Sequence, residues 1–241
     1  MDIFRIIVCV ALFASQSLAQ TGGVDGIVAS AGTEKADIEQ VNAKKGCRSF
    51  EEMDAVGKSW LNFDCSKSSN NKVKKIRNGD DVCWLGGDNK MRVRYMWKAF
   101  DGPPTNGFRT DCSGFVSGMA DVGKRFGGFN TAALGDKCLV YKVEKEEMKP
   151  GDILLNMRGY CKDKIVNNTN AKTFGGHVTM FTKWFNDDKT AYYGYEESAS
   201  KGAVHRYITY PYWRNHSPQC YHAYRFYKSC DATKSPPPHC S

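Results

Sequence analysis

Apolar residues recur at helical spacing in two stretches of the first half of the chain. In the first stretch, Ser49 is followed three residues later by Glu52, which is the pattern of a capping box at the start of a helix. The second stretch begins beside Cys112 and continues to Phe126, where two glycines end it. These spacings predict one helix in each stretch. The apolar positions are Phe50, Met53, Val56, Trp60 and Leu61 in the first, and Phe115, Val116, Met119, Val122 and Phe126 in the second.

The second half of the chain changes to short runs rich in β-branched and aromatic residues, separated by polar loops. The segment "NDDK" (186–189) has the composition of a hairpin turn between two of these runs. Residues 89–100 are compatible with a further helix, which "DGPPTNG" ends. Helices first and strands later are typical of an α+β domain. The predicted strands are "GDILLN", "HVTMFTKWF", "TAYYGYEE" and "AVHRYITY".

Residues 1–19 have the pattern of a secretory signal peptide. Arg5 precedes an apolar run, and small residues stand at positions 17 and 19, the two positions that a signal peptidase recognises. The run is too short to span a bilayer, and nothing later in the sequence is long and apolar enough to do so. We therefore expect no membrane partner, and a soluble protein that is secreted or delivered to a phagolysosomal lumen.

The cysteine count supports an oxidising destination and singles out one thiol. The chain has ten cysteines, and cleavage after Ala19 removes Cys9 and leaves nine. Four disulfides and one free cysteine are the simplest account of an odd number, although the sequence does not fix the pairing. The mature chain has the length of one domain with additions. We expect an N-terminal extension at 20–88, a core domain at 89–210 and a disulfide-stapled C-terminal extension at 211–241.

The formal net charge of +8 favours anionic polymers such as cell-wall material. No Arg-rich run with interleaved aromatic residues indicates nucleic acid, so we expect no nucleic-acid partner. A monomer is the default expectation.

Cys112 is the strongest candidate for chemistry. At a helix N-terminus, unpaired N–H groups and the positive end of the helix dipole favour an anion, here the thiolate nucleophile. His177 starts a predicted strand directly after two glycines, which suits the base that such a nucleophile needs. The next strand returns Glu196 and Glu197 towards His177, and only one of these neighbours can face it. We favour Glu197 as acceptor of the Nδ1 proton, with Glu196 as the alternative. A structural half-cystine and a structural histidine are the competing interpretation.

Four segments resemble the NlpC/P60 peptidases, which are papain-like enzymes that cut peptidoglycan stem peptides. "TDCSGFVSGMA" resembles the nucleophile motif of the family, and "EKEEMKPGDILLN" resembles its Pro-Gly-Asp segment before a strand. "GGHVTMFTKW" and "YEESASKGAV" are similar to the strands that carry the histidine and the third polar residue. Upstream, "RYMWKAF" resembles the family's Tyr-x-Trp, although the pair of glycines that usually follows is missing. The resemblance extends from residue 95 to about residue 205.

This resemblance implies a papain-like core in which the cysteine-bearing helix packs on an antiparallel β-sheet. It also implies hydrolysis of the bond between D-glutamate and the diamino acid of a stem peptide, in digesting bacteria or remodelling a wall. No metal and no cofactor are expected. The implied catalytic residues are Cys112, His177 and Glu197 (or Glu196), and the implied substrate-side residues are Tyr95, Trp97, Asp111, Ser113 and Gly176.

Two other functions remain open. An amidase of the CHAP type has the same order of cysteine and histidine and would cut the bond between muramic acid and L-alanine. A non-catalytic, disulfide-rich wall-binding protein would keep the fold without the chemistry. The second alternative predicts that Cys112 is bridged to another cysteine.

Overall fold

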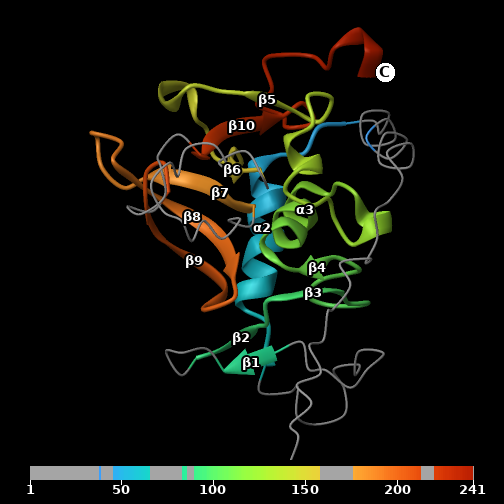
Figure 1. The fold of residues 1–241 in the computed structure, drawn as a ribbon. Helices are drawn as coiled ribbons and strands as arrows, with labels where there is room; N and C mark the ends of the chain where they lie inside the picture. Colours follow the sequence, from blue (N-terminus) through green and yellow to red (C-terminus); the bar gives the residue numbers. More distant parts are fainter. Residues whose placement is uncertain are drawn as a thin grey trace, which may run out of the picture.

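A computed structural model describes residues 38, 46–65, 83–85, 90–157, 176–212 and 220–240 (Figure 1). The expected signal peptide (1–19) lies outside these residues, as does all but residue 38 of the 20–45 segment. The described part is a mixed α/β structure with a six-stranded antiparallel sheet and two helices of more than two turns.

The six-stranded sheet has the strand order β5-β10-β6-β7-β8-β9, and every neighbouring pair is antiparallel. The four strands expected from the sequence are present as β6 to β9. The two others were not expected, and β10 comes from the C-terminal segment yet pairs on both of its edges. The strands are β5 (Val140–Lys142), β6 (Ile153–Asn156), β7 (His177–Trp184), β8 (Ala191–Ser198), β9 (Gly202–Thr209) and β10 (His222–Phe226).

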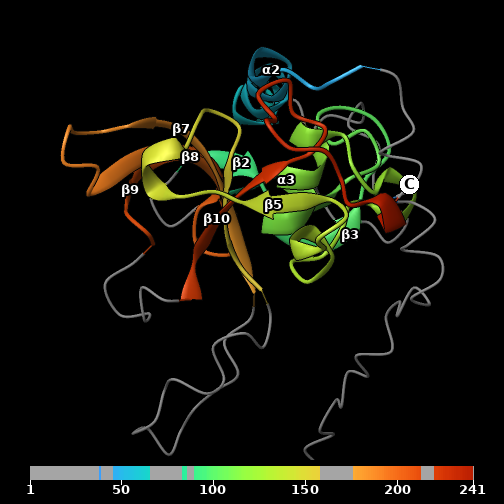
Figure 2. The same cartoon turned by 90° about the horizontal axis from the view of Figure 1, so that it is seen from above.

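Both helices lie on the same side of this sheet (Figure 2). α2 (Phe50–Leu61) begins with the expected capping box between Ser49 and Glu52. α3 (Cys112–Ala120) is buried along its whole length and packs against α2, β7 and β8. Among the described residues, no helix is long and apolar enough to cross a membrane.

α3 is shorter than the sequence pattern predicts. It ends at Ala120 and not at Phe126, because Asp121 and Gly123 take left-handed backbone conformations with φ of 54° and 64°. A short 3-10 helix, η2 (Lys124–Phe126), follows the turn. Phe126 of η2 therefore extends the apolar spacing of the sequence, although α3 has already ended.

The helix expected at residues 89–100 is wrong. This segment forms β2 (Met91–Val93) and β3 (Met96–Ala99), which pair with β1 (Cys83–Leu85) and β4 (Arg109–Thr110). A β-branched residue and aromatic residues occupy alternate positions 93, 95 and 97, and such side chains favour strands. The partner strands lie just outside the segment, so helical propensity within the segment could not reveal them.

Apolar side chains bury both faces of the sheet. On the helix side, Trp60 packs against Phe115, and Phe115 packs against Tyr195 of β8. On the other side, Phe181 and Tyr192 form a second cluster together with residues of β6, β9 and β10. The sheet is therefore the central layer, and α3 is fixed against one face of it.

Disulfides join the terminal segments to this core. Three are fully described: Cys47–Cys230, Cys65–Cys83 and Cys138–Cys240. Cys220 is also disulfide-bonded. Among the described cysteines, Cys112 alone is free, and it is buried.

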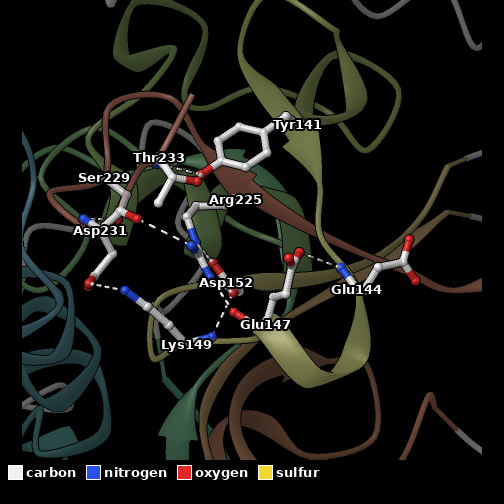
Figure 3. Close-up of polar contacts among 9 residues, drawn as sticks. All are labelled: Tyr141, Glu144, Glu147, Lys149, Asp152, Arg225, Ser229, Asp231 and Thr233. Atoms are coloured by element: carbon white, nitrogen blue, oxygen red, sulfur yellow. Dashed lines mark hydrogen bonds and ion pairs between the residues drawn. The ribbon is translucent and has the colours of Figure 1, made fainter. Parts of the chain in front are cut away.

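A buried ion pair fixes β10 to the turn before β6 (Figure 3). Arg225 donates to the Asp152 carboxylate from Nε (2.7 Å) and from Nη2 (2.8 Å). The same guanidinium donates to the carbonyls of Glu147 (2.7 Å) and Asp231 (3.2 Å). The Lys149 N–H also donates to Asp152, at 2.7 Å. The aspartate of the Pro-Gly-Asp segment thus has a structural role in holding the C-terminal segment.

Candidate active site

Cys112 is the first residue of α3, and the residue before it caps the helix. The Asp111 Oδ1 accepts the Gly114 N–H at 2.7 Å, and the Asp111 carbonyl accepts the Phe115 N–H at 2.9 Å. The sulfur therefore lies at the positive end of a capped, buried helix, with Cys112 itself only 3% exposed.

The start of α3 is locked against the segment before it. A Cβ on Gly114 would lie 2.2 Å from the Arg109 carbonyl oxygen, so only glycine allows this close approach. The Arg109 guanidinium donates to the Gly128 carbonyl (2.7 Å) and the Phe126 carbonyl (3.1 Å), and lies 3.4 Å from Asp111. These contacts fix the position of the cysteine from both sides of the helix start.

His177 is held at the first position of β7. Its backbone pairs with Asn156 of β6, and its Nε2 lies 3.0 Å from the Glu196 Oε1. The expected contact through Nδ1 is thus wrong for the carboxylate, because the Glu196 oxygen lies at Nε2. Burial alone would lower the pKa of His177, but Cys112 and Glu196 raise it to about 10. These two neighbours thus favour the protonated, imidazolium form of the ring.

Glu196 orients this ring. Its carboxylate accepts hydrogen bonds from His177, from the Arg206 Nε and from the Tyr212 hydroxyl. Burial acts to raise the pKa of Glu196, but the hydrogen bonds and charges of His177 and Arg206 lower it to about 2. The only ionised carboxylate that contacts His177 in the described structure is thus Glu196.

The preference for Glu197 as the partner of His177 is corrected by a β-bulge. β7 has one residue more than β8 between the pairs Phe181–Gly194 and Lys183–Tyr193. A regular ladder counted from Lys183 and Tyr193 would have placed Glu197 on the face of His177. The extra residue shifts the register by one position, so Glu196 faces His177 and Glu197 faces the helix side.

The five residues expected on the substrate side differ in their burial and in their contacts. Tyr95 is half-buried, and burial together with the charges of Cys112 and Asp111 raises its pKa far above the ordinary range. Trp97 is 70% exposed on β3. Asp111 and Ser113 are buried, and the Ser113 hydroxyl donates to the Asp111 Oδ2 at 3.3 Å, so both support the helix start. Gly176 directly precedes His177 and is partly exposed.

Three residues of the site were not expected from the sequence. Arg206 lies on β9 opposite Gly194, two positions from Glu196 on the same face, and a correct strand register would have indicated it. Tyr212 and Tyr221 come from the C-terminal segment, and their rings are 4.6 Å apart. Tyr212 also lies against His177, with ring centroids 5.1 Å apart. No local signal points to these two tyrosines, because they lie outside the strands and their contacts are made in the folded structure alone.

Within the described ranges, potential metal ligands gather in one place, away from the residues above. Ligand atoms of Cys138, His239 and Cys240 lie within 4.8 Å of one another. The two sulfurs are bonded to each other in a disulfide, which leaves His239 as the sole available ligand. A surface cavity of about 720 Å³ between residues 99–107 and 124–127 includes none of the catalytic candidates.

The geometry defines a cysteine–histidine–glutamate set, arranged as a nucleophile, a base and a group that orients the base. The chain has no match among protein-family models, curated proteins or solved structures. The site itself and the resemblance in sequence are therefore what indicates a function.

Proposed function

We propose that this protein is a secreted cysteine peptidase that hydrolyses stem peptides of bacterial peptidoglycan. The observation that carries the proposal is the position of Cys112. The one free cysteine of the described residues lies at the N-terminus of a buried helix, and its side chain acts on the His177 ring so as to favour the imidazolium form. Glu196 holds that imidazolium from the far side.

The reaction is an acyl transfer. The Cys112 thiolate attacks the carbonyl carbon of the scissile amide, and the oxyanion that forms is stabilised by backbone N–H groups in the first turn of α3. His177 donates its proton to the leaving amine, the C–N bond breaks, and a thioester remains on Cys112. Water then attacks the thioester while His177 accepts a proton, which releases the carboxylate product and restores the ion pair. Glu196 stabilises the imidazolium at each stage.

The bond class and the papain-like core come from the resemblance to NlpC/P60 peptidases. A helix with an N-terminal cysteine, packed on an antiparallel sheet whose strand begins with the histidine, agrees with that core. The formal net charge of +8 suits an anionic wall polymer. Disulfides in the described residues are compatible with secretion.

The non-catalytic alternative is disfavoured because it requires Cys112 to be bridged, whereas Cys112 is free. The amidase alternative uses the same nucleophile and differs in the bond that is cut. The products therefore distinguish the two enzymes.

The test is a digest of purified peptidoglycan and of a soluble stem peptide, with the products identified by mass spectrometry. Wild-type protein is compared with Cys112→Ala and His177→Gln. His205→Gln is the matched control, because His205 is also on a strand but contacts Thr182 and not Cys112. We expect γ-D-glutamyl fragments from wild type and the control only. Cleavage at the muramic acid amide would identify an amidase, and cleavage by Cys112→Ala would refute the nucleophile.

A further inference from the structure

Glu197 is a buried carboxyl group that the proposed mechanism does not use. The residue is 0% exposed, and neither of its carboxyl oxygens has a hydrogen-bond partner. Its neighbour Glu196 is equally buried but accepts hydrogen bonds from three side chains. Because burying an ionised carboxylate without a partner costs a large free energy, a carboxyl group in the position of Glu197 is stable only in its protonated form.

The groups around Glu197 reinforce this state. Cys112 and Asp111 act on it from the start of α3, and Glu196 acts on it from its own strand. Tyr95 lies within the influence of both the Cys112 and the Glu197 charges. The opposite residue on β9 is the apolar Ala203. Every described ionisable group that acts on Glu197 is thus acidic, and no cation is among them.

Burial and the neighbouring acidic groups change the pKa of Glu197 in the same direction. Burial comes first, and the charges of Cys112, Asp111 and Glu196 add to it, so that the pKa of Glu197 is raised well above its ordinary value. The coupling is reciprocal, since a thiolate that disfavours the Glu197 carboxylate is itself disfavoured by that carboxylate to the same extent.

We propose that Glu197 is a positioning residue that acts as an uncharged acid: it keeps a second negative charge away from the Cys112 sulfur, and its ionisation lowers activity on the alkaline side. This inference rests on the proposed function, in which Cys112 is the nucleophile. When Glu197 loses its proton to solvent, the neighbouring sulfur holds its proton more strongly, and the reactive thiolate–imidazolium pair is depleted. Two adjacent glutamates on opposite faces of β8 thus have opposite roles, with Glu196 ionised for His177 and Glu197 neutral for Cys112.

The activity test compares wild type, Glu197→Gln and the matched neighbour variant Glu196→Gln over the pH range of the stem-peptide assay. Glutamine reproduces the uncharged form, so Glu197→Gln is expected to move the alkaline limb of kcat/KM upward by on the order of one pH unit. Glu196→Gln is expected to lower the rate at every pH without extending the range. An unshifted alkaline limb in Glu197→Gln, or a loss at neutral pH as large as that of Glu196→Gln, would overturn the proposal.

A second measurement needs neither substrate nor a Glu197 variant. Carbon-13 NMR of the glutamate side-chain carboxyls, assigned in wild type and in Cys112→Ser, follows the titration of Glu197 directly. We expect Glu197 to titrate above the surface glutamates, and to titrate at lower pH in Cys112→Ser because the thiolate is gone. Ionisation together with the surface glutamates, or a midpoint that does not respond to Cys112→Ser, would refute the coupling. If the protein cleaves no stem peptide, the proposed function fails while this result still decides the role of Glu197.

Discussion

Replacing Arg225 by methionine tests whether the Pro-Gly-Asp segment has a structural role. In the native protein, the side chains of Arg225 and Asp152 are 4% and 1% exposed, and two hydrogen bonds join them. The substitution keeps the approximate length of the side chain and removes the guanidinium. It leaves the Asp152 charge buried with the Lys149 N–H as its remaining described donor.

The size of the effect follows from these contacts. Removing one partner of a buried ion pair costs about 3–5 kcal/mol of unfolding free energy, because the other charge stays buried without compensation. The carbonyls of Glu147 and Asp231 also lose a donor, at about 1 kcal/mol each where they stay buried. We therefore expect Arg225→Met to destabilise the protein by at least about 3 kcal/mol. The double variant Arg225→Met/Asp152→Asn should recover part of the loss, since no uncompensated charge remains.

Urea unfolding followed by tryptophan fluorescence measures these differences. The matched control is Lys149→Met, because the Lys149–Asp231 ion pair is exposed, with side-chain exposures of 48% and 42%. Exposed pairs contribute about 0–1 kcal/mol, so the control should unfold close to wild type. A cost below about 1 kcal/mol for Arg225→Met, or a double variant as unstable as the sum of its single changes, would refute the reasoning.

Three further predictions concern the site and its pH dependence. Gly114→Ala should lower stability by about 1–3 kcal/mol in thermal unfolding and should slow alkylation of Cys112, because the added Cβ would lie 2.2 Å from the Arg109 carbonyl oxygen. A variant with wild-type stability and a wild-type alkylation rate would contradict this prediction. Glu196→Gln should reduce stem-peptide hydrolysis by roughly 10²-fold or more in steady-state kinetics, since the acid–base step that it supports contributes about 10²–10⁴-fold, and a fall of less than about tenfold would exclude this role. The folded pKa of Glu196 is depressed from 4.5 to about 2, so its stabilisation is present above pH 4.5 and lost as the pH falls towards 2. The folded pKa of His177 is raised from 6.5 to about 10, so the stability that His177 contributes is complete below pH 6.5 and is lost as the pH rises to 10. Urea unfolding across the pH range measures the contributions of Glu196 and of His177. A free energy of unfolding that does not change in either pH window would contradict the corresponding assignment.

The elements nearest the site were predictable because their signals are local. The capping box at Ser49 and Glu52, the apolar face after Cys112 and the alternation in β6 to β9 all depend on residues close in sequence. The odd cysteine count likewise indicated one free thiol, and the free cysteine among the described residues is Cys112.

The features that were missed depend on which segments pair with or pack against one another. The segment at 89–100 forms strands because partners at 83–85 and 109–110 pair with it. The choice between Glu196 and Glu197 turns on one extra residue in β7, and no sequence rule locates that bulge. Tyr212 contacts Glu196 from the segment that follows β9, and no local pattern marks this contact.

The most direct test of the central claim is the rate at which iodoacetamide alkylates Cys112 in the native protein near neutral pH. We expect rapid alkylation of Cys112 in wild type and in His205→Gln, and much slower alkylation in His177→Gln, because an imidazolium at His177 would stabilise the reactive thiolate. A Cys112 that resists alkylation while the protein is folded, or that reacts equally fast without His177, would contradict the assignment of an activated nucleophile.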